Sequence, residues 1–152
     1  MMIKKLAVAA ALALSGLSAQ AIDVIHTIDL LGSPAVGLSA GLSDPSGTAV
    51  NHNLSGIFSD SFTFNFSGSA IVDVWLDTSV SLGNLATQQI VFTSATLNGM
   101  ALTLDPDLVL GGTRFSTAGL FQVPAEGNFT LVVNGYAGLA GSVGQSISAS
   151  YS

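Results

Sequence analysis

The sequence predicts an all-β protein, an antiparallel β-sandwich of jelly-roll or Ig-like type, with little or no helix after its first 21 residues. Three observations predict this class. Apolar and polar residues alternate with a period of two in several short segments. Gly, Asn and Pro separate these segments at short intervals. No segment after the first 21 residues carries apolar residues at the spacing of three and four that marks an amphipathic helix, so any helix should be about one turn long.

Residues 1–21 have the composition of a cleavable secretion signal. Two lysines are followed by an apolar run and by the small-residue cleavage site Ala19-Gln20-Ala21. The apolar run is shorter than the roughly 20 residues of a transmembrane helix. We therefore expect a mature chain, residues 22–152, that forms a single exported domain without a membrane span. Its expected location is extracellular or at the cell surface, with the periplasm as the alternative.

Cleavage of the signal would leave Arg114 as the only Lys or Arg of the mature chain, against nine Asp and Glu. Nucleic acids and anionic lipids are bound chiefly through Lys and Arg, so neither is an expected partner. The chain has no cysteine. Its stability must therefore come from a packed core, with a metal ion or assembly as further sources. Because few charges keep copies apart, self-association through open strand edges is an alternative.

The first strands follow the signal. Val24 to Leu31 is expected to be one strand, and loops containing Pro34 and Pro45 follow it. The clearest alternation starts at Ile57, where one face of the strand collects Phe58, Asp60, Phe62, Phe64 and Phe66. After Gly68, the segment from Ala70 to Thr78 resumes as a strand. One of its faces carries Val72, Val74 and Leu76, and the other carries Asp73, Trp75 and Asp77.

The second half of the chain begins with a predicted hairpin. Gln88 to Leu97 and Met100 to Leu104 flank Asn98-Gly99, a pair that tolerates the positive φ values of a type I′ turn. Asp105-Pro106-Asp107 then closes the second strand. Three further strands are expected at Thr113 to Val123, Asn128 to Asn134 and Gln145 to Tyr151. Asn134-Gly135 reads as a turn, and the last strand directs Ile147, Ala149 and Tyr151 to one face.

A short motif links the chain to a known family. Phe58-Ser59-Asp60-Ser61-Phe62 is an FxDxF motif, and the segment from Gly127 to Gly138 is a glycine-rich ending. With the signal, these features resemble the FxDxF family of bacterial PEP-CTERM proteins over roughly Ile57 to Tyr151. The resemblance implies export and handling by an exosortase, in bacteria that make extracellular polysaccharide, and no known reaction.

The end of the chain departs from that family pattern. The pattern finishes with Pro-Glu-Pro, an apolar span and a basic cluster, whereas this sequence finishes with Ser150-Tyr151-Ser152. We expect a sorting tail that was cut off, because the last strand runs up to Ser152. A tail-less, freely released relative is the alternative.

Asp60 shares its face with four phenylalanines, so a buried Asp60 carboxylate needs a partner. The expected role of the motif residues Phe58, Asp60 and Phe62 is structural. In this interpretation Asp60 accepts backbone N–H bonds or meets Arg114 and so fixes the packing of its strand. A calcium or ligand site at Asp60 is the functional alternative.

Asp73, Trp75 and Asp77 are the candidate ligand face. The two carboxylates should lie about 13 Å apart at roughly 3.3 Å per residue. Glycosidase carboxylates are closer, at about 5 to 9.5 Å. A Trp flanked by acids can instead stack on a sugar ring while the acids accept its hydroxyls, as in a lectin. The alternative is a Trp that covers the edge of the core between two solvated acids.

The sequence contains only partial patterns for a calcium site, a zinc site or a hydrolase site. Asp105 and Asp107 resemble half of a calcium site, although turn chemistry also explains them. No cofactor is expected, and calcium is the metal ion left open. His26 and His52 lack the paired spacing of a zinc site. A hydrolase would need a dispersed Ser-His-acid group, because the sequence has no Gly-x-Ser-x-Gly elbow.

These observations predict a non-enzymatic exported protein of the cell surface or extracellular matrix, associated with exopolysaccharide in a biofilm or with other surface proteins. The first alternative is a carbohydrate-binding, lectin-like module that uses Trp75 with Asp73 and Asp77. The second is a secreted hydrolase.

Overall fold

The computed structural model describes residues 23–29, 31–33, 37–39 and 49–152. The predicted signal, residues 1–21, and the loop positions Pro34 and Pro45 lie outside these residues. Helix in the described part is limited to η1 (Leu82–Asn84) and α1 (Leu85–Gln88), in agreement with the expected single turns. Neither is long and apolar enough to cross a membrane.

Strands make up most of the described chain. In chain order they are β1 (Ile25–Asp29), β2 (Leu31–Ser33), β3 (Gly37–Ser39), β4 (Val50–Leu54), β5 (Gly56–Asn65), β6 (Ser69–Ser81), β7 (Ile90–Leu97), β8 (Met100–Ala101), β9 (Thr103–Leu104), β10 (Leu108–Leu110), β11 (Thr113–Glu126), β12 (Phe129–Ala137) and β13 (Ser146–Tyr151). The strands predicted to begin at Ile57, Ala70, Gln88 and Gln145 are present and begin at Gly56, Ser69, Ile90 and Ser146. β11 runs three residues beyond its predicted end at Val123.

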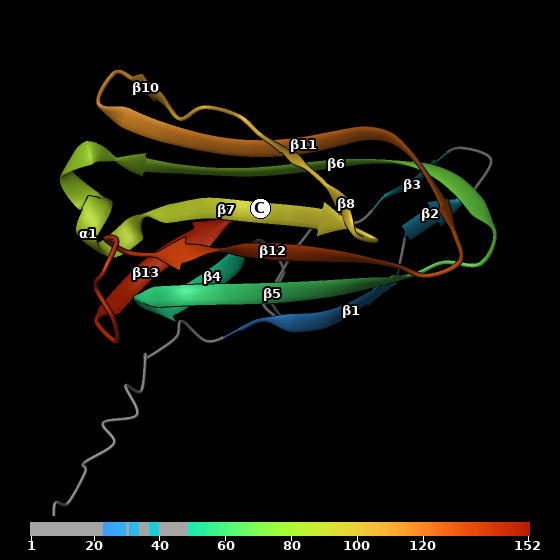
Figure 1. The fold of residues 1–152 in the computed structure, drawn as a ribbon, viewed down its shortest axis with the longest axis horizontal. Helices are drawn as coiled ribbons and strands as arrows, with labels where there is room; N and C mark the ends of the chain where they lie inside the picture. Colours follow the sequence, from blue (N-terminus) through green and yellow to red (C-terminus); the bar gives the residue numbers. More distant parts are fainter. Residues whose placement is uncertain (1–22, 30, 34–36, 40–48) are drawn as a thin grey trace, which may run out of the picture.

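The strands form a β-sandwich, with β6 and β11 along one side and β7, β12 and β5 along the other (Figure 1). One layer has the strand order β1-β5-β12-β7-β8, and the other contains β10-β11-β6, with β9 also paired to β11. The β13-β4 pair continues beside β6, because the backbones of Asp77 and Ser152 exchange hydrogen bonds of 2.8 and 3.0 Å. Among the described pairings β1 is parallel to β5 and the others are antiparallel, which confirms the predicted fold class.

The core contains the faces that the alternation predicted. In β5 the side chains of Phe58, Asp60, Phe62 and Phe64 are buried, and the residues between them are more exposed. Phe64 stacks on Phe129 of β12 with ring centroids 5.0 Å apart. The opposite layer contributes Leu76, Val80, Ala118, Val123 and Ala125. Burial of each large apolar side chain contributes about 1.5 to 3 kcal/mol, so these facing surfaces hold the two layers together.

Two irregular points shape the surface of the sandwich. Asn98 and Gly99 have φ values of 47° and 81° and join β7 to β8, as the predicted type I′ turn requires. On β11 the register against β6 shifts between Leu120 and Val123, which leaves Phe121 and Gln122 in a β-bulge. Gln122 has a φ of 57°, in the left-handed region.

The predicted turn at Asn134-Gly135 is wrong. Both residues lie inside β12, which continues to Ala137 and pairs Gly135 with Phe58 of β5. A side chain at position 135 would have no room, since its Cβ would lie 2.6 Å from Cζ of Phe58. Glycine is therefore required here by the close approach of the Val91 carbonyl oxygen and the Phe58 ring, and not by a turn.

Candidate functional site

The FxDxF motif lies in the interior of the sandwich. Asp60 is fully buried, and its Oδ1 accepts the backbone N–H of Val24 at 2.8 Å. Its Oδ2 accepts the Tyr151 hydroxyl at 2.6 Å and lies 3.0 Å from Nε2 of His52. We call His52, Asp60, Tyr151 and the Val24 backbone the Asp60 cluster. A backbone N–H is thus a partner of Asp60, as expected, whereas Arg114 is not and pairs with Asp107 instead.

The Asp60 cluster joins both layers. Asp60 comes from β5, while His52 and Tyr151 come from β4 and β13 on the opposite side of the core. The His52 ring stacks on Phe58 at 4.2 Å between centroids, and Tyr151 meets Phe92 edge-on at 5.4 Å. Three donors satisfy the carboxylate, so a ligand at Asp60 would have to displace them. This geometry is that of a structural network.

The cluster also bears on the hydrolase alternative. His52 is paired with an acid, but the hydroxyl in the cluster belongs to Tyr151 and bonds the carboxylate, not the imidazole. Nδ1 of His52 is buried and has no hydrogen-bond partner in the described part of the chain. A Ser-His-acid group requires a serine at one imidazole nitrogen and the acid at the other, inside a cleft. The cluster does not have that arrangement.

Tyr151 gives the cluster a testable response to alkaline pH. Burial, together with the charge of Asp60 and the hydrogen bond to it, raises the pKa of Tyr151 far above its ordinary value of about 10. Above pH 10 the unfolded chain loses this proton while the folded chain keeps it, so stability falls as pH rises, by about 1.4 kcal/mol per pH unit. In urea denaturation, the stability advantage of the wild type over Tyr151→Phe should shrink between pH 10 and 11. An advantage that stays constant over this range would contradict the assignment.

Asp73, Trp75 and Asp77 lie on the outward face of β6, as predicted. Trp75 is 52% exposed. The two acids make structural bonds of their own: Asp73 accepts the backbone N–H of Gln122 at 2.7 Å, and Asp77 accepts the Ser152 hydroxyl at 3.0 Å. The predicted flanking of Trp75 by two acids is therefore present in the sheet, but each carboxylate already accepts a hydrogen bond from another residue.

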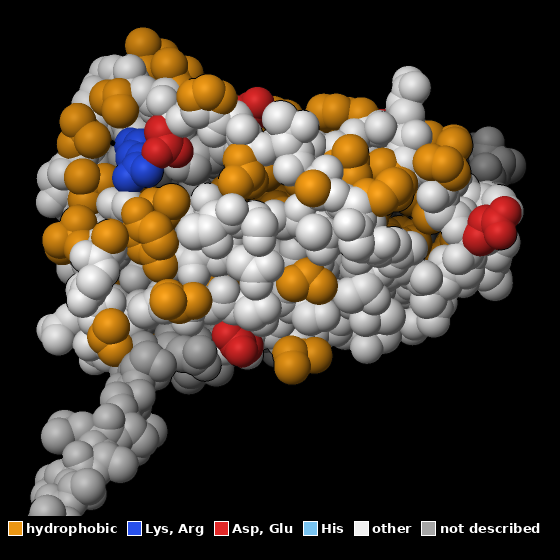
Figure 2. Space-filling model, viewed as in Figure 1, with side chains coloured by type: hydrophobic (Ala, Val, Ile, Leu, Met, Phe, Trp, Pro, Cys, Tyr) orange, Lys and Arg blue, Asp and Glu red, His pale blue; other side chains and the backbone are white. Residues whose placement is uncertain are grey.

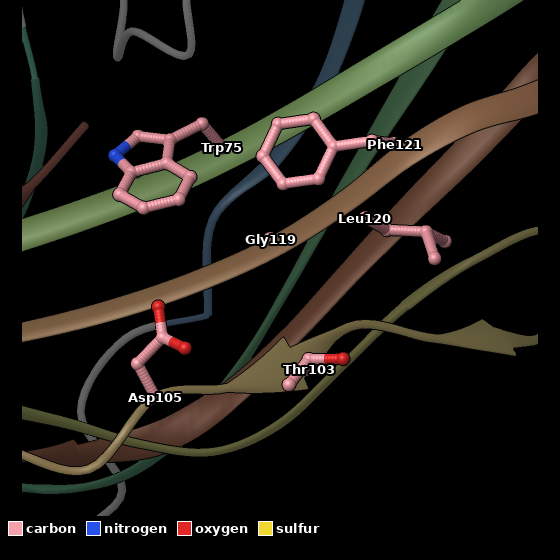
Figure 3. A pocket seen from close by; sticks show the side chains of 6 residues that line it. All are labelled: Trp75, Thr103, Asp105, Gly119, Leu120 and Phe121. Atoms are coloured by element: carbon pink, nitrogen blue, oxygen red, sulfur yellow. The ribbon is translucent and has the colours of Figure 1, made fainter.

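The neighbour that the sequence did not indicate is Phe121. Its ring lies beside that of Trp75, with centroids 6.1 Å apart and planes inclined by 36°, and it is 58% exposed. These two residues line an open pocket of about 360 Å³, which we call the aromatic pocket, together with Thr103, Asp105, Gly119 and Leu120. Figure 3 shows the two rings on one side of Gly119, and Asp105 and Thr103 on the other.

The bulge in β11 explains how the two rings come together. It places Phe121 next to Trp75, and the bond from the Gln122 N–H to Asp73 holds the bulge against β6. Gly119 lies opposite Trp75 in the sheet, and a Cβ there would be 3.1 Å from atoms of both rings. The absent side chain therefore leaves room for the rings. Asp73 acts as a positioning residue for Phe121.

Asp105 supplies the charged group of the pocket. Its Oδ2 accepts the Thr117 hydroxyl at 2.8 Å, and its backbone N–H bonds the Thr117 carbonyl at 3.0 Å. These bonds fix the loop after β9 against β11. The aromatic pocket thus combines two exposed ring faces with an oriented carboxylate and the Thr103 hydroxyl.

Asp107, the other half of the suggested calcium site, has different partners. It accepts hydrogen bonds from Arg114 and Ser116. Burial works to raise the pKa of Asp107, but these bonds and the guanidinium charge outweigh it, so the pKa lies below its ordinary value. Within residues 23–29, 31–33, 37–39 and 49–152 no group of three or more His, Cys, Asp or Glu is placed to hold a metal ion.

A second exposed apolar area lies on β10, an edge strand of its sheet. Leu108, Val109 and Leu110 of β10 are 58%, 54% and 67% exposed, and apolar side chains gather over this strand in Figure 2. In the same view basic side chains occur at one place, whereas acidic side chains occur at several. An apolar edge strand favours association with another chain. β10 is such an edge strand.

Comparisons with protein-family models, with curated protein sequences and with solved structures found no match to this chain.

Proposed function

We propose that this chain is a non-enzymatic exported protein that binds a carbohydrate polymer at the cell surface or in the extracellular matrix. The observation that carries this proposal is the pair of exposed rings in the aromatic pocket. Leaving two adjacent aromatic rings in water forgoes about 25 cal/mol for each Å² of apolar surface that burial would remove from solvent. Exposed apolar groups at a pocket with a few polar groups are typical of a binding surface.

The pocket suits a sugar ring in particular. A pyranose has an apolar face of C–H groups that packs on an aromatic ring, and hydroxyls at its edge that need acceptors. Trp75 and Phe121 offer the ring faces, and Asp105 and Thr103 offer an acceptor and a hydroxyl. Binding of this kind needs no nucleophile and breaks no bond. In this proposal Asp105 takes the acceptor role that the sequence assigned to Asp73 and Asp77.

The proposed location depends on the sequence. Residues 1–21 resemble a secretion signal, and the FxDxF motif and glycine-rich ending resemble exported proteins of bacteria that make extracellular polysaccharide. An acidic chain with one arginine after the signal is unsuited to nucleic acid. Together these features support exopolysaccharide as the partner and a biofilm matrix or cell surface as the place of action.

Trp75→Ala tests the proposal. Because a central aromatic residue of a binding site typically contributes about 2 kcal/mol or more, the dissociation constant for a bound polysaccharide should rise roughly 30-fold. Affinity would be measured by isothermal titration calorimetry against soluble neutral, amino-sugar and uronate polysaccharides. The melting temperature should change little, since the ring is half exposed.

Phe115→Ala is the matched control. Like Trp75, Phe115 is an exposed aromatic residue, but it lies on β11 opposite Ser79 and does not line the aromatic pocket. Its removal should leave affinity unchanged. Loss of folding in Trp75→Ala would show that the indole belongs to the core, and unchanged affinity in a folded Trp75→Ala would exclude the aromatic pocket as the binding site.

A further inference from the structure

We infer that the aromatic pocket recognises a polymer of amino sugars that carry free ammonium groups. This inference rests on the proposed function and names its ligand class. The charges around the pocket, the orientation of Asp105 and the shape of the aromatic surface support it.

The charges around the pocket have one sign. Asp105 lines it, and Asp73 and Asp77 lie on the same exposed face of β6 as Trp75. Arg114, the sole Lys or Arg after the predicted signal, is paired with Asp107. A uronate or sulfated polymer would meet carboxylates without a cation to neutralise it, and like charges brought together disfavour binding. A cationic polymer meets complementary charge.

Asp105 is oriented to receive a cation. The Thr117 hydroxyl holds Oδ2, so the carboxylate does not need to be ordered when a ligand binds. Figure 3 shows the Asp105 carboxylate directed toward β11, below Trp75 in this view. An ammonium group has three donors, and its hydrogen bonds to a carboxylate are roughly twice as strong as those between neutral groups. Trp is also the aromatic side chain that attracts a cation best.

The shape of the pocket favours a sugar over a quaternary ammonium ligand. Proteins that bind a quaternary ammonium group enclose it in a cage of aromatic rings. Here the two rings lie side by side with planes only 36° apart, in a pocket that is open to solvent. Such a surface matches the flat face of a pyranose. The amino group on that pyranose would then reach Asp105.

The single tryptophan makes the experiment direct. Trp75 is the one Trp of the chain, so a change in tryptophan emission reports binding at this pocket. The mature protein would be titrated with a hexamer of β-1,4-linked glucosamine and with its fully N-acetylated form, at a pH where the amines are protonated. The two probes share a backbone and differ in charge. We expect the charged hexamer to bind about tenfold more tightly, which corresponds to one charge-assisted hydrogen bond.

Asp105→Asn should remove this preference. The amide keeps the size of the side chain and one carbonyl acceptor, so affinity for the acetylated hexamer should fall much less than affinity for the charged hexamer, and the two probes should become equal within about twofold. Glu126→Gln, which removes an exposed acid at the far end of β11, is the control and should keep the tenfold preference. Raising the salt concentration should weaken binding of the charged probe alone.

The outcomes separate the inference from the proposed function. If the wild type binds both hexamers equally, or if Asp105→Asn keeps the preference, the inference is wrong and carbohydrate binding stands. If hexalysine shifts the tryptophan emission at the same concentrations, the pocket binds positively charged polymers whether or not they contain sugar rings. The inference is then also wrong. If none of the polysaccharide probes binds the wild type, the proposed function itself fails.

Discussion

Asp60→Ala should lower the free energy of unfolding by about 3 to 5 kcal/mol, the range measured when one partner of a buried charged network is removed. The Tyr151 hydroxyl, Nε2 of His52 and the Val24 N–H would lose their acceptor. Each unsatisfied buried donor costs about 1 to 3 kcal/mol. Urea denaturation followed by tyrosine and tryptophan emission would measure the loss as a lower midpoint with an unchanged slope.

Two further variants locate the effect. Tyr151→Phe removes one bond of the Asp60 cluster and should cost about 1 to 2 kcal/mol. Asp23→Ala removes an exposed carboxylate that also ties the N-terminal segment to β5, through the Ser59 N–H at 2.8 Å. Because water replaces that bond, the cost should stay below about 1 kcal/mol. If Asp60→Ala were as mild as Asp23→Ala, the Asp60 cluster would not be what joins the two layers.

The sequence predicted the faces of β5, β6 and β13, because the period of two is a local property of the chain. It did not predict which residues meet across the core. Tyr151 is 91 positions from Asp60, and nothing in the spacing of either residue indicates the other. Arg114 is the only Lys or Arg that the sequence offers Asp60 after the predicted signal. In the fold Arg114 bonds Asp107, which is only seven positions away, and such short loops close at little entropic cost.

For a related reason, the sequence predicted only part of the aromatic pocket. Alternation placed Trp75 on the outer face of β6, with Asp73 and Asp77. Its neighbours Phe121 and Asp105 depend on the register of β11 against β6, and that register is set by the bulge at Phe121 and Gln122. A bulge shifts by one residue the face that each following side chain occupies. No local pattern around Gln122 marks it, so the pocket could not be assembled from the sequence.

Gly135 shows how a strong local signal can mislead, and it gives the second large expected effect. Asn-Gly is a common turn pair, yet here it lies within β12, between β5 and β7. Gly135→Ala should destabilise the protein by about 3 kcal/mol or more, at the upper end of overpacking effects. The new Cβ would collide with the carbonyl oxygen of Val91 and would lie 2.6 Å from Cζ of Phe58. Thermal and urea denaturation would measure the loss.

The two clashes can be separated, which makes the prediction specific. Gly135→Ala in a Phe58→Leu background relieves the contact with the ring but keeps the contact with the Val91 backbone, so the additional cost of the new methyl group should fall without vanishing. Gly83→Ala is the control, because its nearest neighbour outside the adjacent residues is Oγ of Ser81 at 3.9 Å. That variant should lie within about 0.5 kcal/mol of the wild type. Equal stability of Gly135→Ala and Gly83→Ala would mean that β12 does not pass this close to Phe58 and β7, and would favour the turn that the sequence suggested.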